Sequence, residues 1–144
     1  MSKQYNVAVV GATGAVGEVM IELLHERHFP VAKLSAVASS RSAGSRVTFG
    51  NRSIVVETLE GFDFSDVDIA LFSPGASVSA TYAPKAAAQG CIVIDNTSEF
   101  RYRQDIPLVV PEVNPESIVE YNNCNIIANP NCSTIQMVVA LKPI

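Results

Sequence analysis

The sequence has few of the features that mark nucleic-acid-binding, membrane or secreted proteins. It contains no run of Lys or Arg and carries a net charge of -4, so it lacks the basic face that non-specific nucleic-acid binding needs. No stretch approaches the roughly 18 apolar residues of a membrane span, and no secretory signal precedes the first apolar segment. Its three cysteines form no CxxC pair, which predicts no metal site and suits a reducing compartment. These absences predict a cytoplasmic protein that binds neither nucleic acid nor membrane.

With 144 residues, 48% of them hydrophobic, the chain is long enough to bury the core of one domain. Short β-branched runs alternate with helical patterns. Strands are expected at residues 5–11, 33–39, 68–73, 91–96 and 125–129, with two short strands around a turn at Gly50-Asn51. Helices are expected at residues 17–28, at 76–90 with a kink at Pro84, at 115–121 and from Ser133 on, and residues 106–114 should be extended. Helical crossovers between strands predict a doubly wound α/β domain with a mainly parallel sheet covered on both faces.

A glycine-rich turn, GATGAVG, joins the first expected strand to the first helix. Gly11, Gly14 and Gly17 allow a tight turn and let a phosphate approach main-chain N–H groups. Their spacing, G-x-x-G-x-x-G, differs from the usual dinucleotide fingerprint, G-x-G-x-x-G. Thr13 can donate its hydroxyl to a pyrophosphate, and the helix that starts near Ala15 points its positive end there. The turn predicts nucleotide binding in a Rossmann-like fold, with a merely structural turn as the alternative.

The second expected strand ends in SSRSAG. NAD-binding proteins usually place Asp or Glu here, where the carboxylate binds the ribose 2′-OH. Ser39 and Ser40 stand in that place and are followed by Arg41 and Ser42. An acidic residue would repel a 2′-phosphate, whereas Arg41 can bind it through paired charge-assisted hydrogen bonds. NADP is therefore predicted over NAD, with a solvated loop arginine as the alternative reading of Arg41.

Cys132 lies where the last expected strand turns into a helix, in IIANPNCSTIQ. Ligands of an open parallel sheet bind beyond the carboxyl ends of its strands, so Cys132 is expected at the same edge as the glycine turn. A helix N-terminus favours a thiolate, which could attack a carbonyl near a nicotinamide. The alternative is a buried thiol at a turn. Cys91 is expected in the core, and no role is predicted for Cys124.

No base for this thiol is expected in the chain. The only histidines, His25 and His28, lie near the end of the first expected helix. That helix is roughly 20 Å long at about 1.5 Å per residue. Because the glycine turn marks the cofactor edge, both histidines should lie at the opposite edge, as favourable charges at a helix C-terminus.

Five segments resemble the N-terminal part of aspartate-semialdehyde dehydrogenases: GATGAVG, SSRSAG, DNTSEFR, PLVVPEVN and NPNCSTIQ. The resemblance covers essentially the whole chain, and its last two motifs are specific. It implies that the Cys132 thiolate attacks the aldehyde of L-aspartate 4-semialdehyde and that the resulting thiohemiacetal gives a hydride to NADP. Phosphate then displaces the acyl thioester from Cys132 as L-4-aspartyl phosphate. In the biosynthesis of lysine, threonine and methionine the reaction runs in reverse. Arg101 and Asn131 match the family's phosphate- and substrate-binding positions.

The resemblance also implies the cofactor contacts. These positions fall on Gly11, Thr13, Gly14, Ala15, Val16, Gly17, Arg41, Ser42 and Ser73. Residues 1–131 would form the NADP-binding domain, and residues 132–144 would begin the helix leading into a second domain that this chain lacks. That domain carries the family's histidine base, so the chain alone is expected to bind NADP without turnover.

The whole proteins of the family are expected to be homodimers or larger assemblies with small-molecule and inorganic phosphate partners. The 144-residue chain should expose apolar surface that its missing parts would cover, and self-association through this surface is expected. The residues concerned are Ile135, Met137, Val138 and Val139.

Three other readings remain open at this stage, and the simplest of them is a purely structural α/β module. The related N-acetyl-glutamyl-phosphate reductases share the fold and chemistry but have Gly and Tyr-Pro around their cysteine. A non-catalytic NADP sensor or scaffold of the atypical short-chain dehydrogenase type would also use G-x-x-G-x-x-G. Active members of that fold need Tyr and Lys four residues apart on a helix, whereas Tyr82 and Lys85 are three apart.

Overall fold

The structure is a computed structural model that describes residues 2–144. Its strands are β1 (Tyr5–Val10), β2 (Val31–Ala38), β3 (Arg46–Phe49), β4 (Arg52–Thr58), β5 (Ile69–Phe72), β6 (Ile92–Asp95) and β7 (Ile126–Ala128). Its helices are α1 (Ala15–Glu26), α2 (Ala76–Ala88) and α3 (Cys132–Leu141), together with the 3-10 helix η1 (Pro115–Asn123).

The strands form one sheet in the order β3-β4-β2-β1-β5-β6-β7. β3 runs antiparallel to β4, and the other neighbouring strands are parallel. From β1 the chain passes through α1 to β2 on one side, whereas β5 pairs with β1 on the other side, so the strand order reverses between β1 and β5. Doubly wound folds bind their ligands at such a reversal. The predicted fold class is confirmed.

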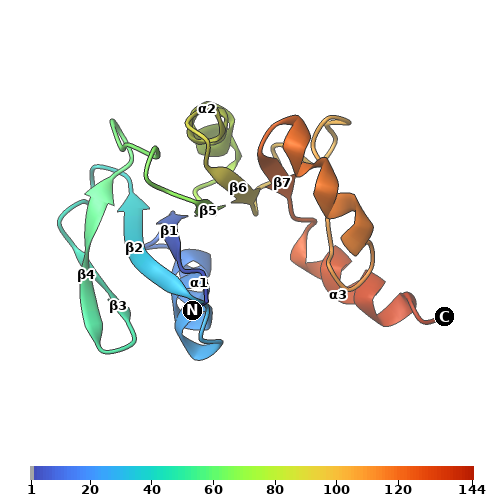
Figure 1. The fold of residues 1–144 in the computed structure, drawn as a ribbon, viewed down its shortest axis with the longest axis horizontal. Coiled ribbons are helices and arrows are strands. Elements are labelled where there is room, and N and C mark those ends of the chain that lie inside the picture. Colours follow the sequence, from blue (N-terminus) through green and yellow to red (C-terminus); the bar gives the residue numbers. More distant parts are fainter. Residues whose placement is uncertain (1) are drawn as a thin grey trace.

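Helices cover both faces of the sheet, α2 above it and α1 below it in Figure 1. Because side chains alternate along a strand, β1 supplies both layers of the core. Val7 and Val9 pack with Ile21 of α1 in one cluster, and Ala8 and Val10 belong to the cluster on the α2 side. This packing on both faces holds the carboxyl ends of the central strands in fixed positions.

Several local predictions are confirmed. The β3–β4 hairpin turns at Gly50-Asn51, and α2 forms in the segment predicted to be helical. The two histidines lie at the edge opposite the glycine turn. The His25 ring meets Phe49 beside the hairpin turn, with 5.6 Å between ring centroids, and His28 follows the end of α1.

Other predictions were wrong in detail. The first helix starts at Ala15, as expected from the glycine turn, but it ends at Glu26, two residues before the predicted end at His28. Residues 106–114 are not extended throughout. Only Leu108 pairs with β7, and the Asn114 side chain then closes a turn by accepting from the Val110 N–H and donating to the Leu108 carbonyl. Such side-chain bonds offer the main chain an alternative to a sheet ladder.

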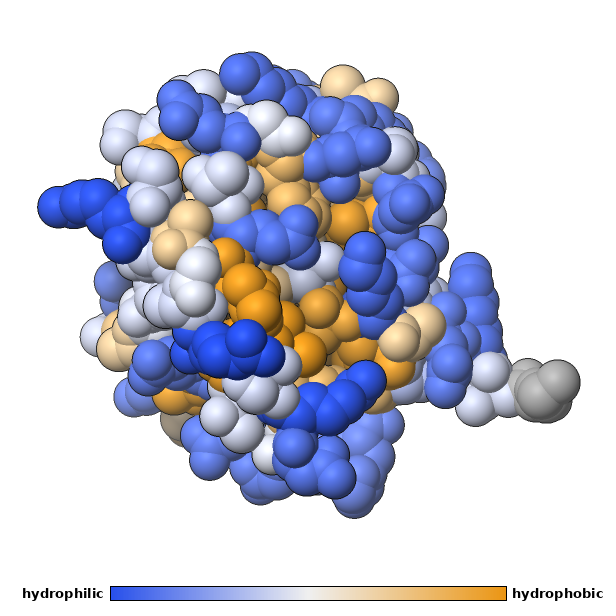
Figure 2. Space-filling view, turned by 90° about the vertical axis from the view of Figure 1, so that its left-hand side faces the viewer, coloured by the Kyte–Doolittle hydropathy of each residue, from blue (hydrophilic) through white to orange (hydrophobic). Residues whose placement is uncertain are grey.

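α3 projects from the sheet at the lower right of Figure 1, and none of its residues is buried. Of the four residues expected to form an apolar surface, Met137 is 56% exposed and Val139 39%, whereas Ile135 and Val138 are half-buried. Figure 2, a view from the side of β3 and β4, shows further apolar residues reaching the surface among hydrophilic ones. Within residues 2–144, no helix is both long and apolar enough to cross a membrane.

Candidate active site

The site lies along one edge of the sheet, where β1, β2, β5, β6 and β7 all end at their carboxyl termini. The glycine turn follows β1 and Cys132 follows β7 by a short loop. Three inter-strand spacings separate β1 from β7, which is about 14 Å at roughly 4.8 Å each. The edge is therefore wide enough to hold an extended ligand between the turn and the thiol.

The glycine turn provides free main-chain donors. Gly11 adopts a φ of 87°, and its N–H donates to the Val37 carbonyl at 2.9 Å, which closes the turn against β2. Among the described residues, no main-chain carbonyl accepts from the N–H groups of Ala15, Val16 and Gly17. These are the unpaired donors of a helix N-terminus, where the helix dipole also favours an anion. The turn thus fits a pyrophosphate.

A hollow of about 480 Å³ opens beside this turn. It brings together five of the predicted cofactor residues, Gly11, Thr13, Gly14, Arg41 and Ser73. The other four predicted cofactor residues do not line it, namely Ala15, Val16, Gly17 and Ser42. The structure therefore gathers the residues that follow β1, β2 and β5 around one concave surface.

Two loops of this hollow are joined directly. The Thr13 hydroxyl donates to the Ser42 Oγ at 3.3 Å, which links the glycine turn to the loop after β2. Arg41 is exposed, and within residues 2–144 its guanidinium forms no hydrogen bond or ion pair with the protein. Its charge is therefore available to a ligand in the hollow.

Several apolar residues that line the hollow were missed from the sequence, among them Leu59, Val78 and Tyr82. Leu59 follows β4, and the other two lie on α2. Their side chains can cover the faces of an aromatic base. Only the topology brings β4 and α2 to the same hollow, so no local pattern marked them. The Lys85 ammonium lies 5.0 Å from the centre of the Tyr82 ring.

Arg101 bridges the ends of β6 and β7. Its Nε donates to the Asn129 carbonyl at 2.8 Å, and its Nη2 donates to the Asn96 carbonyl at 3.1 Å. These bonds hold the guanidinium at the carboxyl edge of the sheet. One of its two acceptors, Asn129, lies only three residues before Cys132 in the chain. The Nη1 group donates to no acceptor in the described part of the chain and remains available to an anion.

Cys132 is the first residue of α3, and its thiol is exposed. Asn131 caps the helix, because its side-chain oxygen accepts from the Ser133 N–H at 2.9 Å. The same oxygen lies 3.9 Å from the Cys132 sulfur. The sulfur thus stands at an exposed helix N-terminus, and the alternative of a buried thiol at this turn is wrong.

The other two cysteines have different surroundings. Cys91 is fully buried, and burial, with the negative charge of Asp68, raises the pKa of its thiol to about 12. Cys124 donates to Asp105 at 3.3 Å, and desolvation together with this carboxylate raises the pKa of the thiol. Both thiols are held in the neutral form.

Alkylation should therefore discriminate among the three thiols. Cys91 is fully buried and the pKa of its thiol is raised to about 12, whereas Cys132 is exposed, so we expect iodoacetamide at pH 8 to modify Cys132 at least about a hundredfold faster. Cys124 should react at an intermediate rate. Peptide mass spectrometry over a time course measures the three rates. In Cys132→Ala, the rates at the other two cysteines should not change. Equal rates at all three in the folded chain would contradict the assignment.

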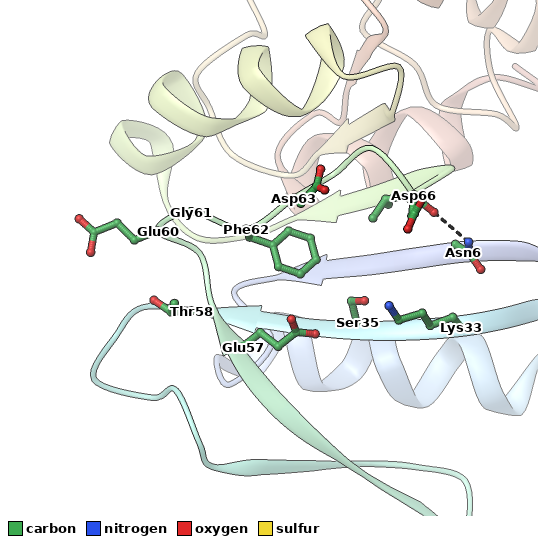
Figure 3. A pocket seen from close by; sticks show the side chains of 11 residues that line it. Asn6, Lys33, Ser35, Glu57, Thr58, Glu60, Gly61, Phe62, Asp63 and Asp66 are labelled. Atoms are coloured by element: carbon green, nitrogen blue, oxygen red, sulfur yellow. Dashed lines mark hydrogen bonds between the residues drawn. The ribbon is translucent and has the colours of Figure 1, made fainter.

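A second hollow, of about 360 Å³, lies below the segment that joins β4 to β5. Figure 3 shows Lys33, Ser35 and Glu57 projecting into it from β2 and β4, with Phe62 above them. Lys33 and Glu57 form no ion pair in the described chain. Within residues 2–144, no three His, Cys, Asp or Glu side chains gather closely enough to hold a metal ion.

Comparison with known proteins places this geometry in a family. Residues 6–121 match the family described as semialdehyde dehydrogenase, NAD binding domain. The chain belongs to this family. A curated relative, aspartate-semialdehyde dehydrogenase 2 of Vibrio cholerae, is 63% identical over 144 residues, which are 100% of this chain and 43% of the relative. The chain thus spans less than half the length of the semialdehyde dehydrogenases it matches.

Solved structures of the family agree with the fold. A crystal structure of aspartate semialdehyde dehydrogenase II from Vibrio cholerae, complexed with ASA, matches with a TM-score of 0.96 and 62% identity. The match covers 98% of this chain and 46% of that one. The enzyme of Candida albicans, solved with NADP, matches with a TM-score of 0.82 and 30% identity over 98% of this chain and 46% of that one.

Proposed function

We propose that this chain is the cofactor-binding and nucleophile-bearing part of an NADP-dependent aspartate-semialdehyde dehydrogenase. The observation that carries the proposal is the arrangement along one sheet edge of a free-donor glycine turn, an anchored arginine and an exposed thiol at a helix N-terminus. Relatives with this name are up to 63% identical over the whole chain. The whole enzyme would interconvert L-aspartate 4-semialdehyde and L-4-aspartyl phosphate in amino-acid biosynthesis.

The cofactor would occupy the hollow beside the glycine turn. Its pyrophosphate would accept from the free N–H groups of Ala15 and Val16. Its 2′-phosphate would meet Arg41, which lines the hollow, and the neighbouring Ser42, which bonds to Thr13. When bound, NADP supplies a hydride acceptor in one direction and, reduced, a hydride donor in the other. The absence of an acidic residue after β2 and the NADP-bound Candida albicans relative support NADP over NAD.

The acyl-transfer step would use residues of this chain. In the biosynthetic direction the Cys132 thiolate attacks the acyl carbon of aspartyl phosphate and forms a carbon–sulfur bond. The carbon–oxygen bond to the phosphate breaks, and inorganic phosphate leaves with the electron pair. The Arg101 guanidinium would hold this phosphate and offset its charge. The N-terminus of α3 would stabilise the thiolate before attack.

Complete turnover is not expected from these residues alone. Both histidines lie at the other edge of the sheet, so the site has no imidazole base within the described chain. Loss of a general base costs a factor of about 10² to 10⁴ in rate.

The exposed apolar side chains of α3 also support self-association, which sedimentation analysis would reveal as a mass above that of one chain.

The acyl-transfer step can be tested without the cofactor. We expect L-4-aspartyl phosphate to acylate Cys132 of the 144-residue chain once, with release of one inorganic phosphate. Mass spectrometry of the Cys132 peptide detects the thioester, and a phosphate assay measures the release. Cys132→Ala should give neither product, whereas Cys124→Ala should give both. An adduct distributed over several cysteines would contradict the proposed nucleophile.

A further inference from the structure

Asp95 is a buried carboxylate that the proposed chemistry does not use. It ends β6 at the ligand-binding edge of the sheet, and it is 0% exposed. No cation lies within ion-pair distance of it in residues 2–144. Burial of a charged group without a counter-ion is costly unless hydrogen bonds compensate for the lost water. A carboxylate in this position therefore has specific partners.

Two hydroxyl groups supply those partners. Ser79 Oγ donates to Oδ1 at 2.6 Å, and Thr97 Oγ1 donates to Oδ2 at 2.6 Å. These lengths are typical of charge-assisted O–H···O bonds. Ser79 lies on α2, whereas Thr97 lies on the segment that leads to Arg101. Each oxygen of the carboxylate thus holds a different part of the molecule.

The Thr97 side continues directly to the arginine. The Thr97 hydroxyl oxygen accepts from the Glu99 N–H at 3.3 Å, which shapes the turn before Arg101. Asn96, between Asp95 and Thr97, accepts from the Arg101 guanidinium through its carbonyl. The Asp95 carbonyl accepts from the Asn129 N–H at 2.8 Å, and the Asn129 carbonyl is the second acceptor for Arg101. Asp95 is therefore next to both anchors of the guanidinium.

We propose that Asp95 is a positioning residue for the anion site, because its bond to Thr97 fixes the segment that presents Arg101. The proposal rests on the proposed phosphate-binding role of Arg101. A purely structural role, in which Asp95 only ties α2 to the sheet, would depend on Ser79 instead. The two oxygens therefore give a matched pair of variants that separates the two roles.

The test uses the 144-residue chain, inorganic phosphate as the probe and the NMR signal of the Arg101 Nε–H. Thr97→Ala should weaken phosphate binding about tenfold, as expected when a group that orients a ligand is lost, and should speed hydrogen exchange of the Nε–H. Thr97→Ser retains the hydroxyl, so its phosphate affinity and its Nε–H exchange rate should be close to those of the wild type. Ser79→Ala should lower stability but leave both readouts near wild type. Asp95→Asn should weaken phosphate binding and speed Nε–H exchange as Thr97→Ala does. If Asp95→Asn does not fold, the comparison of Thr97→Ala with Thr97→Ser still tests the proposal.

Three outcomes overturn the proposal. The first is that Thr97→Ala and Ser79→Ala change phosphate affinity and Nε–H exchange equally. The second is that Thr97→Ser restores neither readout. The third is that the Arg101 Nε–H exchanges in Thr97→Ala at the wild-type rate. Arg101→Ala separates this proposal from the proposed function. If phosphate affinity does not fall in Arg101→Ala, the phosphate role of the arginine fails, and exchange at the Nε–H alone then decides whether Asp95 positions Arg101.

Discussion

Gly17→Ala is expected to destabilise the chain strongly, although alanine is the better helix former. A Cβ at position 17 would lie 2.1 Å from the Gly11 carbonyl oxygen and 2.8 Å from its carbon. Alanine gains about 1 kcal/mol in helix propensity. Overpacking against main-chain atoms costs about 3 kcal/mol, because no flexible side chain can move aside. We expect a net loss of about 2 kcal/mol in the free energy of unfolding, measured by urea denaturation.

Gly14→Ala is the matched control in the same turn. Its Cβ would lie 3.4 Å from the Gly11 carbonyl oxygen, which is ordinary contact, and its φ of -84° suits alanine. We expect a loss below about 1 kcal/mol, the effect of an unfavourable helix cap. Gly17→Ala should also weaken NADP binding, since the start of α1 must move away from β1. Equal stabilities of the two variants would show that the close approach of α1 to β1 is not needed.

Arg41→Ala should remove the preference for NADP. A hydrogen bond to a charged group contributes about 1.5–3 kcal/mol, but Arg41 is exposed and solvent screens its charge. We therefore expect the dissociation constant for NADP to rise about tenfold and that for NAD to stay constant. Titration calorimetry with both nucleotides measures the two constants. The NADP effect should shrink as the salt concentration rises, because salt screens the exposed charge.

Arg46→Ala is the control for charge alone. Arg46 lies on β3, where its Nε donates to Ser53 at 2.7 Å, and it does not line the hollow beside the glycine turn. This variant should leave the ratio of NADP to NAD affinity unchanged. Arg41→Lys should retain part of the preference, since it keeps the charge but not the paired donors. A loss of NAD affinity equal to that of NADP in Arg41→Ala would contradict recognition of the 2′-phosphate.

The sequence predicted those parts of the fold that depend on local patterns. Buried β-branched runs located the strands, and the glycines after β1 located the first strand-to-helix turn. Nothing in the sequence pattern indicated that Phe64 and Val67, between β4 and β5, are buried without belonging to a helix or strand. The turn at Asn114 was also missed, since a side chain bonding to its own neighbourhood leaves no periodic pattern.

The candidate site shows the same division. The sequence indicated Gly11, Thr13 and Arg41, and these residues meet in one hollow because each follows a strand of the same edge. It gave no indication of Tyr82, which reaches the hollow from α2. Nor did it indicate Asp95, whose proposed positioning role depends on its hydrogen bonds from the hydroxyls of Ser79 and Thr97. Contacts between distant elements exist only once the sheet order is known.

The bonds made by Arg101 affect how its variants must be interpreted. The side chain joins two main-chain carbonyls at the ends of neighbouring strands, in addition to carrying a charge. A lysine would preserve the positive charge, but a single ammonium on a flexible stem cannot reproduce the guanidinium's fixed fork. Any substitution at this position therefore removes a cross-link between the ends of β6 and β7 as well as the proposed anion-binding group. Loss of activity alone would therefore not distinguish a missing electrostatic contact from a loss of order in the segments that follow β6 and β7.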